Sequence, residues 1–132
     1  MIRLAARTQY ALRAMIALAV HGPMSLDRLA ADQDIPRRYC GDVLRFLRQA
    51  DLVHSQRGSD GGYRLAHPAE RITLADVIQA TEGVSPPPPH FSGAAEPLTE
   101  IWERLHRHQS TLLSEITLAH VIGSSNEETT HR

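Results

Sequence analysis

The sequence lacks lysine entirely, contains a single cysteine, Cys40, and has no apolar run of membrane-spanning length. One cysteine excludes a disulfide within the chain and agrees with a reducing compartment. The residues from Met1 to Leu4 lead directly into an amphipathic segment, without the apolar stretch and cleavage site of a signal peptide. We therefore expect a cytoplasmic protein without a membrane partner.

Motifs for catalysis and for cofactor binding are also missing. The sequence has no Ser-His-Asp order, no paired-carboxylate motif and no phosphate-binding glycine loop. The glycine-rich stretch from Gly58 to Gly62 lies between two predicted strands and opens no helix, so it does not match a dinucleotide fingerprint. We expect neither an enzyme nor a bound cofactor.

Charge is distributed unevenly, although the net charge of the 132 residues is only -1. Residues 1–71 hold eleven arginines and seven acidic residues, a balance of +4, whereas residues 72–132 hold three arginines and eight acidic residues, a balance of -5. This asymmetry is typical of a chain that meets phosphate at one end only.

Three helices are predicted in the basic half. Apolar residues recur at helical spacing from about Thr8 to His21, and Ser25 is a natural N-cap for a short second helix. Pro36 suits the first position of a third helix. The pattern of that helix turns one set of residues inward: Tyr39, Cys40, Val43, Leu44 and Leu47. It leaves another set outside: Arg37, Arg38, Asp42, Arg45 and Arg48. The short turn between the second and third helices matches helix-turn-helix spacing.

A glycine-rich hairpin follows the third helix. The stretch from Ala50 to Leu65 reads as a strand, a tight turn carrying Arg57, and a second strand in which Tyr63 and Leu65 share one face. A hairpin behind such a helix outlines a winged helix-turn-helix. The predicted fold is therefore mainly α, with a two-stranded wing, and residues 1–83 form the DNA-binding domain.

The acidic half adds a capped helix, a linker and a long helix. Thr73 and Asp76 form a capping pattern that opens a fourth helix ending at Gly83. Residues 84–97 contain four consecutive prolines and are predicted to be an extended linker. Residues 98–122 are predicted to be a dimerisation helix, and residues 123–132 a disordered tail. The apolar stripe of the long helix comprises Leu98, Ile101, Trp102, Leu105, Leu112 and Ile116.

Two further features of this half are a short repeat and the open question of what covers the long helix. Residues 116–122 repeat the pattern of residues 72–78, and both segments read as Thr-capped helix starts. The long stripe could fold back on its own domain or pair with a second chain. We favour a homodimer, because two-fold symmetry suits a helix-turn-helix protein on a palindrome.

Matching fragments along nearly the whole chain resemble the Rrf-two family of bacterial transcription regulators. These fragments are residues 9–14, Ile35 with Tyr39, residues 52–53 with Ser55, residues 57–58, residues 61–63 with Leu65, residues 72–78, residues 82–83, Trp102 and residues 116–119. The resemblance implies a homodimeric winged-helix regulator, acting as a repressor on double-stranded DNA with a palindromic operator. It also implies that the long helix crosses to the partner subunit.

This sequence departs from the family pattern in two places. Cluster-binding members carry three cysteines in the loop before the long helix, whereas residues 84–97 have none, with Glu96 and Thr99 standing near the ligand positions. An iron–sulfur cluster held by thiolates is therefore not expected. In the third helix, Gly41 and Asp42 stand where a member has two base-contacting residues, so the operator sequence should differ.

Residues of the wing and the third helix are the main candidates for DNA contact. Arg57, with Gly58 beside it, could enter a minor groove, although an arginine beside a turn can simply be solvated. The four arginines of the third helix could contact base edges or phosphates, with one or two only facing solvent. Asp42 could accept from a cytosine amino group or pair with a neighbouring arginine.

Four further residues complete the candidate DNA-binding set. Ser25 could place backbone N–H groups near a phosphate, as well as capping its helix. The resemblance places Arg7 and Tyr10 near the DNA backbone and Tyr39 in the recognition segment. For Tyr10 the alternative is packing under the wing.

The signal that this regulator would sense is not encoded in a recognisable motif. A small ligand or partner protein could act on the linker of residues 84–97 or on the groove between it and the DNA-binding unit. Cys40 could sense oxidation, with nearby arginines lowering its pKa, or could be a buried hydrophobe. His90 and Glu96 could join a metal site, or be solvated. A winged-helix adaptor that binds no DNA is the remaining alternative.

Overall fold

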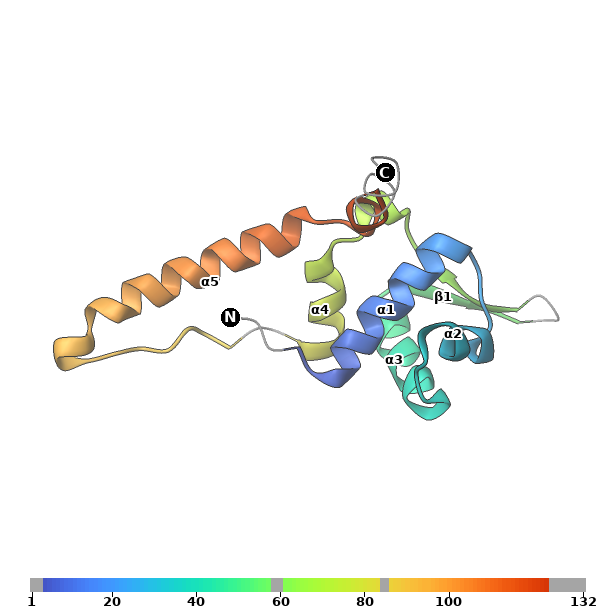
Figure 1. Cartoon of the computed structure of the whole chain (residues 1–132), viewed down its shortest axis with the longest axis horizontal. Helices are drawn as coiled ribbons and strands as arrows, with labels where there is room; N and C mark the ends of the chain where they lie inside the picture. The colour runs from blue at the N-terminus through green and yellow to red at the C-terminus, as the bar shows by residue number, and fades with distance from the viewer. Residues whose placement is uncertain (1–3, 58–60, 84–85, 124–132) are drawn as a thin grey trace, which may run out of the picture.

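The computed structural model describes residues 4–57, 61–83 and 86–123. Its first three helices are α1 (Ala6–His21), α2 (Leu26–Gln33) and α3 (Arg37–Gln49). Their apolar faces form one core, in which the largest fully buried side chains include Met15, Leu18, Leu29, Leu44 and Leu47. The three predicted helices and the helix-turn-helix order of α2 and α3 are confirmed (Figure 1).

The caps of α2 and α3 refine the predictions. The Ser25 hydroxyl accepts a hydrogen bond from the Arg28 backbone N–H at 3.2 Å, so Ser25 is the N-cap as predicted. Pro36 is the N-cap of α3 and not its first helical residue, so the helix begins at Arg37, one residue later than predicted. The inward orientation predicted for Tyr39 is wrong, since this side chain is 56% exposed. It lies at the edge of the apolar stripe of α3, where a one-residue step carries a side chain out of the core.

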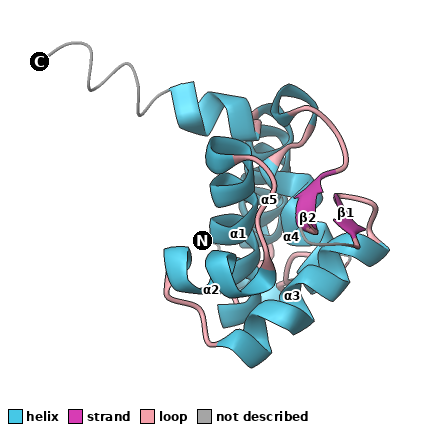
Figure 2. Cartoon of the chain, turned by 90° about the vertical axis from the view of Figure 1, so that its right-hand side faces the viewer, coloured by secondary structure: helices cyan, strands magenta, loops and turns pink. Residues whose placement is uncertain are grey.

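A two-stranded wing follows α3. Strand β1 (Val53–Gln56) pairs antiparallel with β2 (Gly62–Leu65), with Val53 opposite Leu65 and Gln56 opposite Gly62. Figure 2 shows the two strands side by side next to the helices. The wing is joined to the start of α2, because the backbones of Met24 and Tyr63 exchange hydrogen bonds of 3.0 and 2.7 Å.

Helix α4 (Leu74–Glu82) packs against α1 and closes the domain. Thr73 and Asp76 form the predicted capping box at its start. At its end the Thr8 hydroxyl of α1 lies 2.8 Å from the Thr81 hydroxyl and donates to a Glu82 carboxylate oxygen at 2.9 Å. Because a carboxylate only accepts, Thr8 donates its proton to Glu82, and the Thr81 hydroxyl also lies within donating distance of the Val77 and Ile78 carbonyl oxygens. The same Glu82 oxygen accepts from the Ala5 backbone N–H at 3.1 Å, so α4 holds the first turn of α1.

A long arm leaves the domain after α4. Residues 86–92 run outward as an irregular chain, a 3-10 turn η2 (Gly93–Ala95) reverses the direction, and α5 (Pro97–Glu115) returns alongside (Figure 1). The Phe91 backbone N–H donates to the Thr99 hydroxyl at 2.8 Å, and the Phe91 ring meets Trp102 edge-on at 6.0 Å. No residue of α5 is buried.

The prediction of one helix over residues 98–122 is wrong at its C-terminal end. α5 ends at Glu115, and Ile116 is extended, with φ -90° and ψ 117°. Thr117 pairs with Thr73 in an antiparallel bridge, and a helical turn then begins at Leu118, capped by Thr117 accepting from the His120 N–H at 3.1 Å. A Thr side chain competes with continued helix by capping a new one.

This break removes Ile116 from the stripe of α5 and confirms the Thr-capped start. The two similar segments, residues 72–78 and 116–122, meet at their first residues. The tail proposed for residues 123–132 lies outside the described residues, apart from Gly123. Within the described ranges, every helix is too short or too polar to span a bilayer.

Candidate nucleic-acid interface

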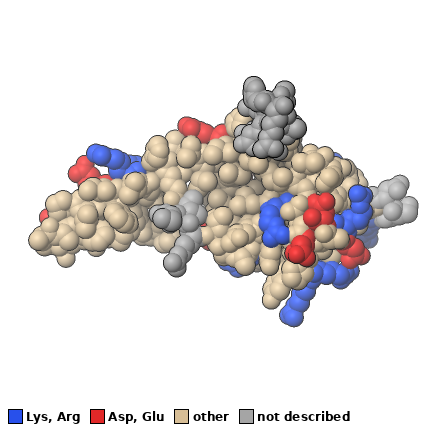
Figure 3. Space-filling model, in the orientation of Figure 1, with Lys and Arg blue, Asp and Glu red and all other residues tan. Residues whose placement is uncertain are grey.

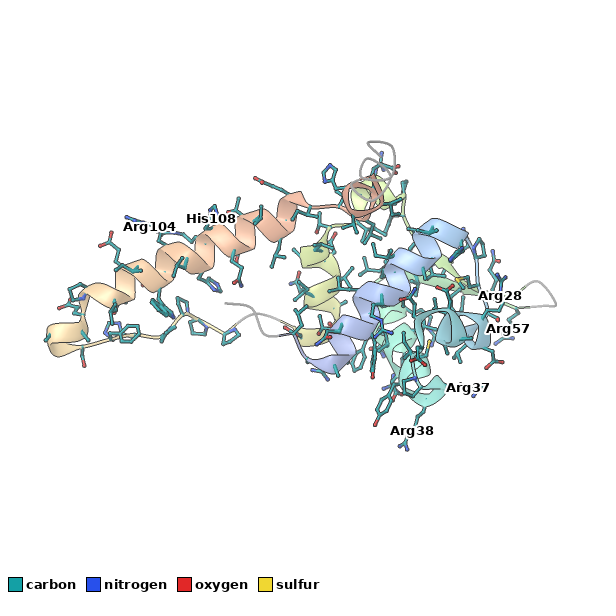
Figure 4. The ribbon with its side chains drawn as sticks, in the orientation of Figure 1. Arg28, Arg37, Arg38, Arg57, Arg104 and His108 are labelled. Carbon is teal, nitrogen blue, oxygen red and sulfur yellow. The ribbon has the colours of Figure 1, made fainter. Side chains whose placement is uncertain are left out.

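The exposed face of α3 carries most of the predicted DNA contacts. Arg37, Arg38, Asp42, Arg45 and Arg48 are all exposed, as the sequence predicted. In Figure 4, Arg37 and Arg38 lie at the N-terminal end of α3, and Arg38 projects away from the body of the molecule. Figure 3 shows arginine side chains at the end of the molecule that carries α2, α3 and the wing, with acidic side chains among them.

Two of the α3 arginines are engaged in exposed ion pairs. Arg37 Nε lies 2.6 Å from Asp27 Oδ1 of α2, and Arg45 Nη2 lies 3.7 Å from Asp42 Oδ1. Among the alternatives for Asp42, the structure therefore shows the pairing with a neighbouring arginine. Exposed ion pairs contribute little stability, so a phosphate can replace either carboxylate at small cost.

The wing places a further arginine one residue beyond the last paired position of β1, Gln56. Arg57 directly follows β1 and is exposed. Figure 4 shows Arg57 at the same end of the molecule as Arg28 of α2, an exposed residue that the sequence reasoning missed. The exposed position of Arg28 one turn after the Ser25 cap was the available signal. Gly58, also predicted to contact DNA, lies outside the described residues.

An aromatic cluster connects the start of α1 with α3. Arg7 Cζ lies 5.5 Å from the centroid of the Phe46 ring, and Arg45 Cζ lies 5.6 Å from the same centroid. Tyr10 and Tyr39 are tilted rings 6.4 Å apart. These side chains line an open groove of about 500 Å³. Sequence reasoning missed Phe46, because its partner Arg7 is 39 positions away and only the folded chain brings the two together.

Cys40 does not have the environment of a reactive thiol. Its side chain is fully buried, and burial raises its pKa from the ordinary value of 9.0. A sensing thiol needs the opposite shift, so the predicted lowering by nearby arginines is wrong. Arg37 and Arg38 are exposed and point away from the core that surrounds Cys40.

The described residues also contain no group of three or more His, Cys, Asp or Glu side chains that could hold a metal ion. His90 and Glu96 are both exposed on the arm. Within the described part of one subunit, nothing supports the hypothesis that His90 and Glu96 bind a metal ion together.

Comparison with known proteins places this geometry among helix-turn-helix regulators. A family model described as "Rrf2: Iron-dependent Transcriptional regulator" matches residues 4–124. A helix-turn-helix regulator of Mycobacterium tuberculosis strain H37Rv is 36% identical over 137 residues, covering 96% of this chain and 85% of that protein. The regulator IscR of Photobacterium profundum is 34% identical over 95% of this chain and 78% of its own length.

Solved structures agree with these sequence relatives. The global cysteine regulator CymR of B. subtilis superposes with a TM-score of 0.81 at 32% identity, covering 94% of this chain and 98% of that one. IscR of T. potens gives the same TM-score and identity over 96% of this chain and 90% of its own.

The family description names iron, so the donor groups of this chain decide whether it can hold a cluster. Iron–sulfur clusters are held chiefly by cysteine thiolates. The only cysteine of the sequence is buried in the core beneath α3, and the arm contains none. These residues do not fit a thiolate-held cluster.

Proposed function

Because the chain belongs to the Rrf2 (Rrf-two) family of transcriptional regulators, we propose that it is a homodimeric repressor that binds a palindromic operator. The protein is a DNA-binding winged helix-turn-helix regulator. What supports the finer proposal is the position of α3 and the wing at one end of the molecule, with the apolar arm leading away from them.

Each DNA-binding element has a distinct role in this proposal. The exposed face of α3 enters a major groove, where its arginines contact base edges and phosphates. The wing lies along the neighbouring minor groove, with Arg57 inside it. Ser25 and Arg28 at the start of α2, with Arg7 and Tyr10 on α1, lie against the backbone.

The arm supports a second copy of the chain as the partner. Leu98, Ile101, Trp102, Leu105 and Leu112 are 40–55% exposed, although all are large apolar side chains. A contiguous apolar stripe of this kind marks an interaction surface. Two identical arms pairing about a two-fold axis would cover both stripes at once and present two α3 helices to half-sites one helical turn, or a small multiple, apart.

The regulatory signal in this proposal is not a thiolate-held cluster. We place the effector, which is a small ligand or a partner protein, on the linker residues 86–97 or in the groove between them and the domain. We place the regulator itself in the cytoplasm. Elemental analysis and the visible spectrum of anaerobically purified protein test this. A colourless, metal-free protein that binds its operator supports the proposal, and a coloured iron protein contradicts it.

Replacing Arg57 tests the assignment of the wing. We first select operator sequences from random duplexes, and then compare Arg57→Ala with Arg104→Ala, which removes an arginine from the arm far from α3 (Figure 4). Arg57→Ala should weaken operator binding by about 1–3 kcal/mol and leave the dimer intact. The Arg104→Ala control should bind normally. Unchanged affinity of Arg57→Ala contradicts the wing assignment, and a protein that binds no duplex at low salt contradicts the function itself.

A further inference from the structure

Phe46 holds two arginines from different helices against one aromatic ring. The guanidinium carbons of Arg7, from the first turn of α1, and Arg45, from α3, lie 5.5 and 5.6 Å from its centroid. Both distances fall within the range of cation–π attraction. The ring is half-buried, whereas both arginines are exposed. The aromatic ring is therefore held by packing, whereas the two guanidinium groups are accessible to a ligand.

The charges around this groove favour an anion. Its lining contains two guanidinium groups and one carboxylate, that of Asp42, which lies 3.7 Å from Arg45 Nη2. Arg7 forms no ion pair with any described residue. The groove therefore carries one positive charge in excess, beside a face of α3 that is itself rich in arginine.

We propose that Arg7 and Arg45, held on the Phe46 ring, form a clamp for the sugar–phosphate backbone of one DNA strand. This inference rests on the proposed function and names the part of the DNA that the groove contacts. A guanidinium presents a planar fork of N–H donors that matches phosphate oxygens, and stacking on a ring leaves that edge free. Each guanidinium carbon lies within 5.6 Å of the same ring centroid, so the two are at most twice that distance apart and can reach one phosphate or neighbouring ones along a strand.

Such a clamp positions the protein without reading sequence. Contacts to phosphate fix the register of a protein on the duplex and are the same for every sequence. Here the clamp joins the start of α1 to the middle of α3, so it sets how α3 enters the groove. Phe46 is a positioning residue in this arrangement, since it acts through the two arginines.

Asp42 acts as the counter-ion of the empty clamp. Its exposed pair with Arg45 holds that side chain beside the ring until a phosphate takes its place. The carboxylate also repels the incoming phosphate, which weakens binding to every duplex alike.

The first experiment locates the phosphate. A selected operator is prepared with a single uncharged methylphosphonate at each backbone position in turn, and affinity for the full-length protein is measured. At one backbone position per half-site, or at two adjacent ones, the methylphosphonate should weaken binding of the unaltered protein. At the same position it should leave the affinity of Arg7→Gln and of Arg45→Gln unchanged. Each variant should lower the salt dependence of binding by about one released ion and weaken operator and unrelated duplexes by the same factor.

The second experiment tests the ring. Phe46→Leu keeps an apolar side chain in the half-buried position but removes the aromatic face, and should weaken binding to all duplexes about two- to fivefold. Phe46→Tyr keeps the face and should bind like the original protein. The matched charge control, Arg104→Gln, lies on the arm and should leave both the phosphate pattern and the salt dependence unchanged.

The outcomes separate this clamp from the function on which it rests. If the unaltered protein ignores every duplex, the proposed function fails. If it binds its operator while Arg7→Gln and Arg45→Gln respond at distant phosphates, or at all phosphates like the unaltered protein, only the clamp is overturned. Equal losses in Phe46→Leu and Phe46→Tyr would show that packing, not the aromatic face, is what the position needs.

Discussion

Gly62 at the start of β2 is a position where a single added methyl group collides with the backbone of another segment. Its φ of +153° is one that L-residues rarely adopt. A Cβ atom there would lie 2.4 Å from the Met24 carbonyl oxygen, 2.7 Å from the Met24 carbonyl carbon and 2.9 Å from the Ser25 nitrogen. All three are backbone atoms, so no side-chain rotation relieves the collision. Gly62→Ala must push the wing away from the start of α2.

The cost of this displacement can be worked out from the contacts it breaks. The two hydrogen bonds between Met24 and Tyr63, of 3.0 and 2.7 Å, join the wing to α2. Each such bond contributes about 0.5–1.5 kcal/mol. A non-glycine residue in this backbone region costs about 1–3 kcal/mol more. We expect the free energy of unfolding to fall by about 2–6 kcal/mol, a large part of the total of about 5–15 kcal/mol that is usual for a domain.

Gly22→Ala is the matched control for this measurement. Gly22 also has a left-handed φ, +80°, but a Cβ added there meets nothing within 4 Å. It therefore carries backbone strain without the collision, and the difference between the two variants isolates the close approach to Met24. Equilibrium urea unfolding followed by far-ultraviolet circular dichroism gives both free energies. Equal losses in the two variants would refute the reasoning, as would a Gly62→Ala protein of unchanged stability and operator affinity.

Three further predictions concern the arm, the core and α3. Leu105→Glu places a charge in the apolar stripe of α5 and should convert the dimer to a folded monomer, measured by light scattering with circular dichroism as the check on folding; a persistent dimer contradicts the assigned interface. Because burial raises the pKa of Cys40 above 9.0, the unfolded chain loses the thiol proton first, so the free energy of unfolding should fall as pH rises past about 9. Urea titrations at about pH 8 and about pH 10 give the free energy of unfolding at each pH, and in Cys40→Ala the fall between these two values should be absent. Asp42→Asn frees Arg45 and should strengthen binding to every duplex alike, whereas relaxed specificity at one operator base would show that Asp42 reads a cytosine instead.

Local physics explains which parts of the fold could be predicted from the sequence. Ser25 and Thr73 cap helices because their side chains accept hydrogen bonds from backbone N–H groups three residues ahead, a relation contained within one turn. The inward set of α3 follows from helical period alone, and Cys40, Val43, Leu44 and Leu47 are buried as predicted. Tyr39 fails because periodicity does not say where the edge of the stripe meets solvent.

Contacts between distant segments account for what was missed. Nothing near Phe46 in the sequence indicates that Arg7 will lie over its ring, since α1 and α3 must first pack together. The end of α5 was also mispredicted because of a contact with a distant segment. The apolar pattern continues through Ile116, but the chain leaves the helix there, where its backbone pairs with Ile72 to Leu74. A local helical pattern cannot report this competing pairing.

The way the arm is anchored bears on how two subunits would read one operator. The arm leaves the domain after α4, and its return segment pairs with the residues that cap the start of α4, so both ends are attached to the same helix. The end of α4 in turn holds the first turn of α1 through Thr8, Thr81 and Glu82. That turn carries Arg7, which lies over the Phe46 ring of α3. A second copy bound along the arm would therefore be linked to α3 through hydrogen-bonded and packed contacts. Two half-sites at a constant spacing require such a connection, because a flexible joint would let the two α3 helices drift out of phase with the DNA helix.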